Sequence, residues 1–250
     1  MIIAFKKLQG FILHSRDGDL GTARDLYFDD RHWAVRYLVA ETGSWLSSRQ
    51  VLISPYALGE VMQGTQRIAV DLTKEQIERS PPLGSQVPVS MQFERDYHGY
   101  YGWPVYWGTP LLWGDYSDIV RNKEKHVPVP HEDRKWDHHL RSTCVVRGYH
   151  LQATNGEIGH VEDFLIDDET WAIRYLVINT GNWWTGKNIL VSPTWIQRVS
   201  WSESKLFMEI SREEVRKSPQ YFGERPLTKE DEIALHLHYR RQGSAASSLA

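Results

Sequence analysis

The chain has 250 residues, a formal net charge of −3 and a single cysteine, Cys144. A slightly acidic balance gives no global attraction for phosphate, so nucleic acid is not expected as a partner. One cysteine excludes an intramolecular disulfide and fits a reducing compartment, so we predict a cytoplasmic location. The sequence shows neither a signal-peptide start nor about 18 consecutive apolar residues, which predicts a soluble protein with no integral membrane segment.

The sequence contains one segment twice. Trp33–Val39 (WAVRYLV) returns as Trp171–Val177 (WAIRYLV). The offset that carries Trp33 onto Trp171 is called the repeat offset below. Without a gap, it aligns two repeats that run from Gly10 to Pro82 and from Gly148 to Gln220. The aligned pairs include Gly18 and Gly156, Gly21 and Gly159, Asp25 and Asp163, Trp45 and Trp183, and Ser80-Pro81 and Ser218-Pro219. The repeats share turn and strand positions, which a backbone needs, rather than residues that a reaction needs.

Each repeat is predicted to open with a β-hairpin. Phe11–His14 and Thr22–Phe28 flank Asp17-Gly18, and Asn155-Gly156 stands at the equivalent place in the second repeat. Gly tolerates the positive φ that tight hairpin turns require, so a polar residue followed by Gly between two β-like runs predicts a hairpin.

A third strand is predicted from Trp33 to Ala40, led by its tryptophan. The pairs Asp29-Asp30 and Asp167-Asp168 precede this strand in the two repeats. Two adjacent carboxylates lack the alternating oxygen spacing of a calcium loop, so we interpret them as turn formers.

Two more strands and a helix are predicted to complete each repeat. Val51–Ile53 and Ile189–Val191 are short apolar runs closed by Ser-Pro, as expected of buried strands. Alternating strands follow at Arg67–Leu72 and Lys205–Ile210. Five or so short strands at close spacing predict an all-β fold, a small antiparallel barrel or sandwich in each repeat.

The helices have matching start signals. Thr73 with Gln76, and Ser211 with Glu214, fit the capping box, in which the hydroxyl accepts a backbone N–H and the residue three later reaches back. Each helix is expected to stop at the Ser-Pro that follows it, after about two turns.

This pattern resembles the PRC-barrel domain, here in tandem. The features that carry the resemblance are the hairpin ending in Gly-x-x-x-Asp, the paired-Asp turn, the Arg-Tyr-Leu-Val strand and the apolar run closed by Ser-Pro. The family is named for the cytoplasmic part of the photosynthetic reaction-centre H subunit. The resemblance implies a six-stranded β-barrel used mostly as a docking module, with no catalytic motif to carry across. We predict these parts: 1–82 and 142–222 as barrel modules, 83–141 as an aromatic insert with a charged connector, and 223–250 as a helix with a disordered tail.

Six residues are predicted to have structural roles in the repeat: Asp25, Trp33, Arg36, Asp163, Trp171 and Arg174. Arg36 and Arg174 fall in mid-strand, where an unpaired charge would be costly to bury. Each is therefore expected to pair with a carboxylate, such as Asp25 or Asp163.

The insert holds an aromatic and glycine-rich run, residues 97–108, which would expose a large apolar surface if it stayed free in water. One interpretation is that these aromatic side chains fold back as satellite core. The other is a partner-binding surface, because Tyr and Trp carry much of the energy at interfaces. The candidate partner-binding residues are Tyr100, Tyr101, Trp103, Tyr106, Trp107 and Trp113, with Trp183-Trp184 as a second candidate loop.

Metal and catalytic signals are weak. The connector histidines, His126, His131, His138 and His139, match no strong metal signature, so no metal and no cofactor are predicted. The sequence has no Gly-x-Ser-x-Gly elbow and no phosphate-cradling glycine loop, so we predict that the protein is not an enzyme.

The predicted function is a non-enzymatic adaptor that binds another protein, of unknown identity, through barrel surface and aromatic insert. The alternatives are a small-molecule or metal-binding protein with its site between the barrels, and a peripheral component of a membrane complex by analogy with the reaction-centre subunit. Homo-oligomerisation is also left open.

Overall fold

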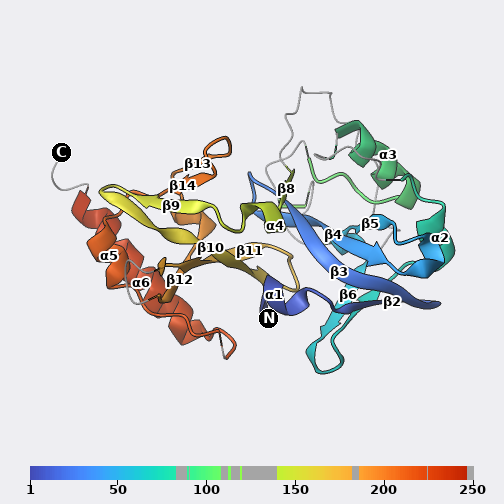
Figure 1. The fold of residues 1–250 in the computed structure, drawn as a ribbon, viewed down its shortest axis with the longest axis horizontal. Coiled ribbons are helices and arrows are strands. Elements are labelled where there is room, and N and C mark those ends of the chain that lie inside the picture. The colour runs from blue at the N-terminus through green and yellow to red at the C-terminus, as the bar shows by residue number, and fades with distance from the viewer. Residues whose placement is uncertain are drawn as a thin grey trace. The chain divides into compact units, whose positions relative to one another are not determined.

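The computed structural model describes residues 1–82, 89, 91–107, 112–113, 119, 140–181, 186–223 and 225–246. The chain divides into two compact units (Figure 1). Unit 1 comprises Met1–Lys6, Cys144–Asp167 and Ile173–Ala250, and unit 2 comprises Lys7–Thr143 and Asp168–Ala172. The chain therefore changes unit more than once along its length.

Unit 2 is built on one seven-stranded sheet. Its strands are β2 (Ile12–Ser15), β3 (Gly18–Asp29), β4 (Ala34–Thr42), β5 (Gln50–Ile53), β6 (Leu58–Met62), β7 (Arg67–Val70) and β8 (Leu140–Ser142). The hydrogen-bonded order is β5-β4-β3-β2-β7-β6, with β8 on β3. The helices are α2 (Lys74–Glu78) and α3 (Met91–Tyr101), and short 3₁₀ turns lie at Ser44–Leu46, Pro55–Ala57 and Gln63–Thr65.

Unit 1 repeats this plan. Its strands are β1 (Ile2–Ala4), β9 (His150–Ala153), β10 (Gly156–Asp167), β11 (Ile173–Asn179), β12 (Asn188–Val191), β13 (Arg198–Ser200) and β14 (Lys205–Phe207). The order β12-β11-β10-β9-β14-β13, with β1 on β10, is the order of unit 2 strand for strand. The helices are α5 (Arg212–Arg216) and α6 (Lys229–Ala246), with a 3₁₀ turn at Pro193–Trp195.

The predicted mostly-β class is confirmed by these two sheets. The sheet orders run from β5 to β6 and from β12 to β13, and in the described part of the chain no pairing joins the two ends. Closure into a barrel stays a prediction.

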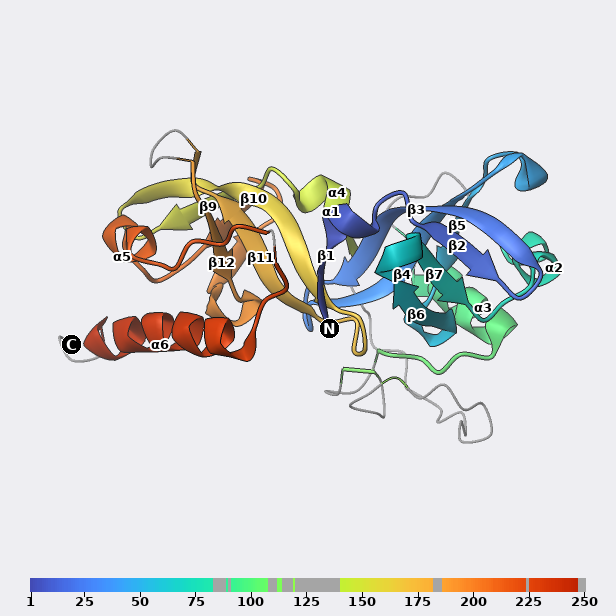
Figure 2. The same ribbon diagram turned by 90° about the horizontal axis from the view of Figure 1, so that it is seen from below.

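The first strand of each repeat lies in the sheet of the other repeat. β1 pairs with β10, with Ile2 opposite Asp167 (Figure 2). β8 pairs with β3, with Leu140 opposite Asp29. The repeat offset relates both members of the two pairs, so the exchanged strands occupy equivalent registers. The short helices α1 (Phe5–Leu8) and α4 (Thr143–Val146), also equivalent, contain the unit boundaries. The repeat therefore begins at Ile2 rather than at Gly10.

The repeated aspartates anchor the exchanged strands. The Asp163 carboxylate accepts the backbone N–H of Lys6 at 3.1 Å. The Asp25 carboxylate accepts the hydroxyls of Ser142 at 2.5 Å and Thr143 at 2.6 Å. Burial raises the pKa of Asp163 to about 6, although backbone N–H groups that donate to it act in the opposite direction. Each of these aspartates thus holds the first strand of the other repeat in its own sheet.

The predicted hairpins are confirmed, because β2 pairs antiparallel with β3 and β9 with β10. A second glycine pair is required just beyond each turn. A Cβ on Gly21 would lie 2.0 Å from the carbonyl oxygen of Glu41, and one on Gly159 would lie 2.0 Å from that of Asn179. Only glycine fits where these strands approach each other.

The tryptophans do not lead their strands as predicted. Trp33 and Trp171 adopt φ values of 52° and 56°, a left-handed conformation that is uncommon for a bulky residue. The strands begin after them, at Ala34 and Ile173. Trp171 is buried, whereas Trp33 is half-buried and stacks on Phe28 with ring centroids 5.2 Å apart.

Both capping boxes are confirmed. Thr73 and Ser211 accept the backbone N–H groups of Gln76 and Glu214, whose side chains accept the backbone N–H groups of the capping residues. At the C-terminal helix, Thr228 accepts the backbone N–H of Asp231. Helix α6 begins at Lys229 and extends to Ala246, within the segment 223–250 that was predicted as a helix with a disordered tail. Of the helices in the described residues, none combines the length and the apolar character needed to cross a membrane.

Candidate functional site

Helix α3 lies inside the segment 83–141, which the sequence analysis described as an aromatic insert with a charged connector and for which it predicted no helix. Glu94, Tyr97, His98 and Tyr101 follow the spacing of one helical face, and all four are buried in unit 2. The sequence prediction missed this helix because only one side of it is apolar or aromatic, and the other side reads as linker. The i, i+3, i+4, i+7 spacing was the available signal.

A polar cluster forms where α3 meets β4. The Tyr37 hydroxyl lies 2.9 Å from Glu94 Oε1 and 2.8 Å from His98 Nε2. Tyr106 donates to the same Glu94 oxygen at 2.5 Å, and His98 Nδ1 lies 2.9 Å from the carbonyl oxygen of Pro104. Every polar atom named here therefore has a partner inside the cluster.

Burial sets the protonation of this cluster. It raises the pKa of Glu94 to about 7, against the hydrogen bonds from Tyr106 and Tyr37, and it lowers the pKa of His98 to about 4. A hydroxyl has one proton, so Tyr37 makes two hydrogen bonds only if the carboxyl or the ring supplies a second. His98 Nδ1 must donate to the Pro104 carbonyl oxygen, so Nε2 of the neutral ring can only accept, and the second proton must come from the Glu94 carboxyl. The cluster is therefore most complete when Glu94 is neutral.

Arg36 is the buried charge of the same region. Its Nε donates to Asp29 Oδ2 at 2.5 Å and its Nη1 to the carbonyl oxygen of Leu112 at 2.6 Å. Burial alone would raise the pKa of Asp29, but Arg36 and the hydrogen bonds from His32 outweigh it and lower the pKa to about 2. The predicted partner, Asp25, was wrong: the carboxylate comes from Asp29 at the end of β3, because Asp25 is engaged with the exchanged strand.

Rings from the insert cover the Arg36 guanidinium. Its central carbon lies 4.1 Å from the centroid of Tyr106 and 4.7 Å from that of Trp113. Trp113 also donates to the carbonyl oxygen of Thr170 at 3.1 Å. A guanidinium stacked on aromatic faces and paired with a carboxylate is an arrangement that tolerates burial.

The six candidate partner-binding residues divide into two groups. Tyr101, Trp103, Tyr106 and Trp113 are buried, and the rings of Tyr101 and Trp103 stack at 4.2 Å. Tyr100 is exposed over 41% of its surface and donates to the carbonyl oxygen of Gln76, and Trp107 is half-buried against His98. Partner binding by these six residues stays a prediction. Of the six, Tyr100 and Trp107 are the ones whose side chains remain accessible to a partner.

Unit 1 contains the same cluster. The repeat offset places Glu232 and His236 of α6 where Glu94 and His98 stand in α3. Tyr175, the counterpart of Tyr37, donates to Glu232 Oε1 at 2.9 Å and lies 3.3 Å from His236 Nε2. The repeat therefore extends through a helix with the pattern Glu-x-x-x-His, well past the boundary that the sequence analysis set.

Arg174 differs from Arg36 in its carboxylate partner and in its exposure to solvent. It lies 3.4 Å from Glu232 Oε1, and its side chain remains 46% exposed. The predicted pairing with Asp163 was wrong, because Asp163 accepts hydrogen bonds from the exchanged strand. A carboxylate partner exists in both repeats, but it comes from the end of β3 in unit 2 and from helix α6 in unit 1.

Several predicted features fall outside the described residues: His126, His131, His138, His139, Trp183 and Trp184. In the described part of the chain, no group of three or more His, Cys, Asp or Glu side chains is placed to hold a metal ion. Cys144 is exposed.

The fold defines a protein of two repeated β-sheet units, each with a helix packed on its Arg-Tyr strand through a Tyr-Glu-His cluster. Residues 147–215, in the second repeat, match the family model of the PRC-barrel domain. The chain therefore contains a PRC-barrel domain, and the resemblance is confirmed for that repeat. No curated protein matches the chain.

Proposed function

We propose that this protein is a non-enzymatic adaptor whose two repeats are both PRC-barrel modules and which binds a protein partner through unit 1. The equal strand order of the two sheets, their equivalent exchanged strands and their matching capping boxes support a tandem arrangement. A PRC-barrel domain over residues 147–215 fits an interaction module of small size.

The observation that carries the proposal is a set of exposed apolar side chains on unit 1, which together are called the docking surface. Phe222, Ile233 and Leu237 are exposed over 71%, 59% and 51% of their surface. Ile233 and Leu237 lie one turn apart on the same face of α6. The equivalent residues of the first repeat are Gly84, Arg95 and Gly99, so the repeat carries apolar side chains at these positions only in its second copy. Apolar side chains on one helical face are typical of a docking surface.

Burial of the reactive groups supports a role without catalysis. The pKa of Glu94, about 7, would suit a general acid or base, but Glu94 and His98 are only 3% and 2% exposed. A catalytic group must come within hydrogen-bond reach of its substrate, and the polar atoms of these two side chains bond to tyrosine hydroxyls and a backbone carbonyl. We therefore assign the cluster to holding α3 on the sheet.

The test is affinity purification of the intact protein from its own cells, followed by quantitative mass spectrometry. The variant I233D/L237D should lose its dominant partner while its thermal unfolding stays unchanged. The matched control, R95D/G99D, carries aspartate at the equivalent positions of the first repeat and should retain the partner. A partner list that both variants leave unchanged would refute unit 1 as the docking unit. Loss of a self-associated species alone would show that the surface joins two copies of this chain.

A further inference from the structure

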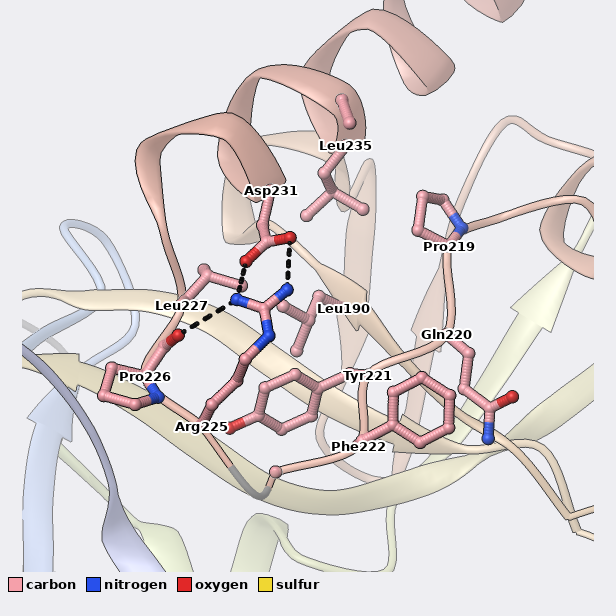
Figure 3. Close-up of a pocket in the computed structure, with 12 residues that line it drawn as sticks. Leu190, Pro219, Gln220, Tyr221, Phe222, Arg225, Pro226, Leu227, Asp231 and Leu235 are labelled. Carbon is pink, nitrogen blue, oxygen red and sulfur yellow. Dashed lines mark hydrogen bonds and ion pairs between the residues drawn. The ribbon is translucent and has the colours of Figure 1, made fainter.

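Unit 1 has a pocket between the segment that follows α5 and the first turns of α6 (Figure 3). Its apolar wall is formed by Pro219, Tyr221, Phe222, Pro226, Leu227 and Leu235. Arg225 and Asp231 close one side with a bidentate ion pair, at 2.6 and 2.8 Å. The hollow measures about 100 Å³, which suits one ring rather than a drug-sized ligand, whose pockets begin at roughly 300 Å³.

In the first repeat, the positions equivalent to the pocket-lining Leu235 and Asp231 carry aromatic rings. Tyr97 and Phe93 of α3 stack there at 5.2 Å, and Tyr97 is 1% exposed. The repeat offset replaces Tyr97 by Leu235 and Phe93 by Asp231. The second repeat therefore lacks both rings. The pocket lies next to Leu235 and Asp231, the smaller side chains that replace them.

The first repeat also shows which polar group such a ring meets. The Tyr97 hydroxyl donates to the carbonyl oxygen of Leu52 on the edge strand β5, at 2.5 Å. Leu190 of β12 is the counterpart of Leu52 and lines the pocket. Its carbonyl points to the same side as that of Asn188, two residues earlier in the strand, which accepts the Tyr221 N–H at 2.8 Å. The Leu190 carbonyl is thus directed away from β11, toward the place of a phenol hydroxyl.

We propose that this pocket binds a phenol ring, supplied by a tyrosine side chain of the protein partner. The ring packs between Tyr221, Phe222 and Leu235, and its hydroxyl donates to the Leu190 carbonyl. Phe222, one of the three exposed apolar residues assigned to docking, also lines the pocket. The inference rests on the proposed function for the source of the tyrosine, but the chemistry of the pocket is testable without any partner.

The experiment is a titration of the ¹⁵N-labelled full-length protein, followed by amide chemical shifts. The probes are N-acetyltyrosinamide, N-acetylphenylalaninamide and p-cresol. N-acetyltyrosinamide should shift the amides around Leu190, Tyr221 and Leu235, and N-acetylphenylalaninamide should bind several-fold more weakly because it lacks the donor. Equal binding of the two amides would overturn the role of the Leu190 carbonyl. Binding of p-cresol without N-acetyltyrosinamide would overturn a partner's tyrosine in favour of a free small phenol, and no binding of any probe would overturn the pocket.

The variant L235Y supplies the matched control, because it restores the ring that the first repeat carries. Filling the pocket from within should weaken N-acetyltyrosinamide by about tenfold or more and leave the fold intact. L235Y should also reduce partner capture. Retained capture by L235Y together with loss by I233D/L237D would overturn this inference and leave the proposed function standing. The remaining outcome is that both variants retain the partner while the parent protein still binds N-acetyltyrosinamide. That result would refute the docking surface, and with it a protein partner as the source of the ring.

Discussion

Unit 2 and unit 1 hold the same Arg-Tyr strand against the same Glu-x-x-x-His helix, but unit 2 buries this arrangement and unit 1 leaves it partly open. Arg36 is 1% exposed, whereas the Arg174 side chain is 46% exposed. The difference comes from the segment after α3, whose Tyr106 and Trp113 rings cover Arg36. These two rings are called the aromatic cover of unit 2. Because of this cover, the arginine of unit 2 is part of a buried network of charges, whereas the arginine of unit 1 forms an ion pair at the surface.

Burial then changes the chemistry of otherwise equal residues. In unit 2 it raises the pKa of Glu94 and lowers that of His98, so the cluster favours a neutral acid next to a neutral ring. Glu232 makes the same contact with a tyrosine but also meets a half-exposed arginine. Identical residues at identical spacing are thus predicted to differ in their contribution to stability, and paired substitutions can test this.

The largest difference is expected for the two arginines. Arg36→Ala leaves the buried Asp29 carboxylate without its cation and should cost about 3 to 5 kcal/mol of unfolding free energy. Arg174→Ala removes a solvent-screened pair and should cost at most about 1 kcal/mol. Urea unfolding followed by tryptophan fluorescence compares the two. Equal losses would show that the cover does not isolate Arg36 from solvent.

The buried aromatic rings that follow α3 are expected to belong to the hydrophobic core of unit 2. Trp103→Ala removes a ring that stacks on Tyr101 and is 9% exposed, and we expect a loss of about 3 kcal/mol. Trp107→Ala removes a half-buried ring and should cost much less. Thermal unfolding of the two single variants separates these effects. A stable Trp103→Ala protein that no longer captures its partner would instead restore the insert as the binding surface.

The pH dependence of stability should reveal the buried cluster through its single variants. Glu94 has a folded pKa of about 7, above its ordinary 4.5, so its stabilising contribution is complete below pH 4.5 and is lost as the pH rises through 7. His98 has a folded pKa of about 4, below its ordinary 6.5, so its contribution is complete above pH 6.5 and is lost as the pH falls through 4. Between pH 4.5 and 6.5 the two slopes oppose each other and largely cancel.

Removing either group should expose the slope of the other, at up to about 3 kcal/mol over its window. Asp163, whose folded pKa is also raised, adds the same falling slope to the parent protein and to both variants, so the variants are compared with the parent. Relative to the parent, the stability of Glu94→Gln should rise more steeply between pH 4.5 and 7, and that of His98→Gln should fall more steeply between pH 4 and 6.5. Urea unfolding at a series of pH values measures both slopes. Glu232→Gln is the matched control, for the carboxyl that unit 1 leaves partly open. A slope in Glu94→Gln equal to that of the parent protein would contradict the buried assignment.

The smallest expected effect is one that should be equal in the two units. Thr73→Ala and Ser211→Ala each remove the hydroxyl of a complete capping box, which should cost about 1 kcal/mol. Hydrogen exchange of α2 and α5 amides reports each helix separately. Clearly unequal losses of protection in α2 and α5 would mean that the two units differ in more than the aromatic cover of unit 2.

Much of the local structure was legible in the sequence, because it depends on residues close together in the chain. The hairpin turns, the buried runs before Ser-Pro and the capping boxes were all predicted from spacing and residue type. The Glu94 and Glu232 helices were equally legible in principle. The Glu232 helix was predicted within 223–250, but the Glu94 helix and its equivalence to the Glu232 helix were missed. Few aligned positions of the two helices are identical, so the identities are diluted along them.

The sequence by itself determined that one module occurs twice, where its turns fall and which strand faces are apolar, since these follow from short-range propensity and periodicity. Only the tertiary structure decided that β1 and β8 exchange places, because both strands fit equivalent registers and the sequence favours neither sheet. It also decided that Asp29 rather than Asp25 pairs with Arg36, and that aromatic rings bury one copy of the cluster. These outcomes depend on contacts between segments far apart in the chain, and a charge acquires its environment only when those segments meet.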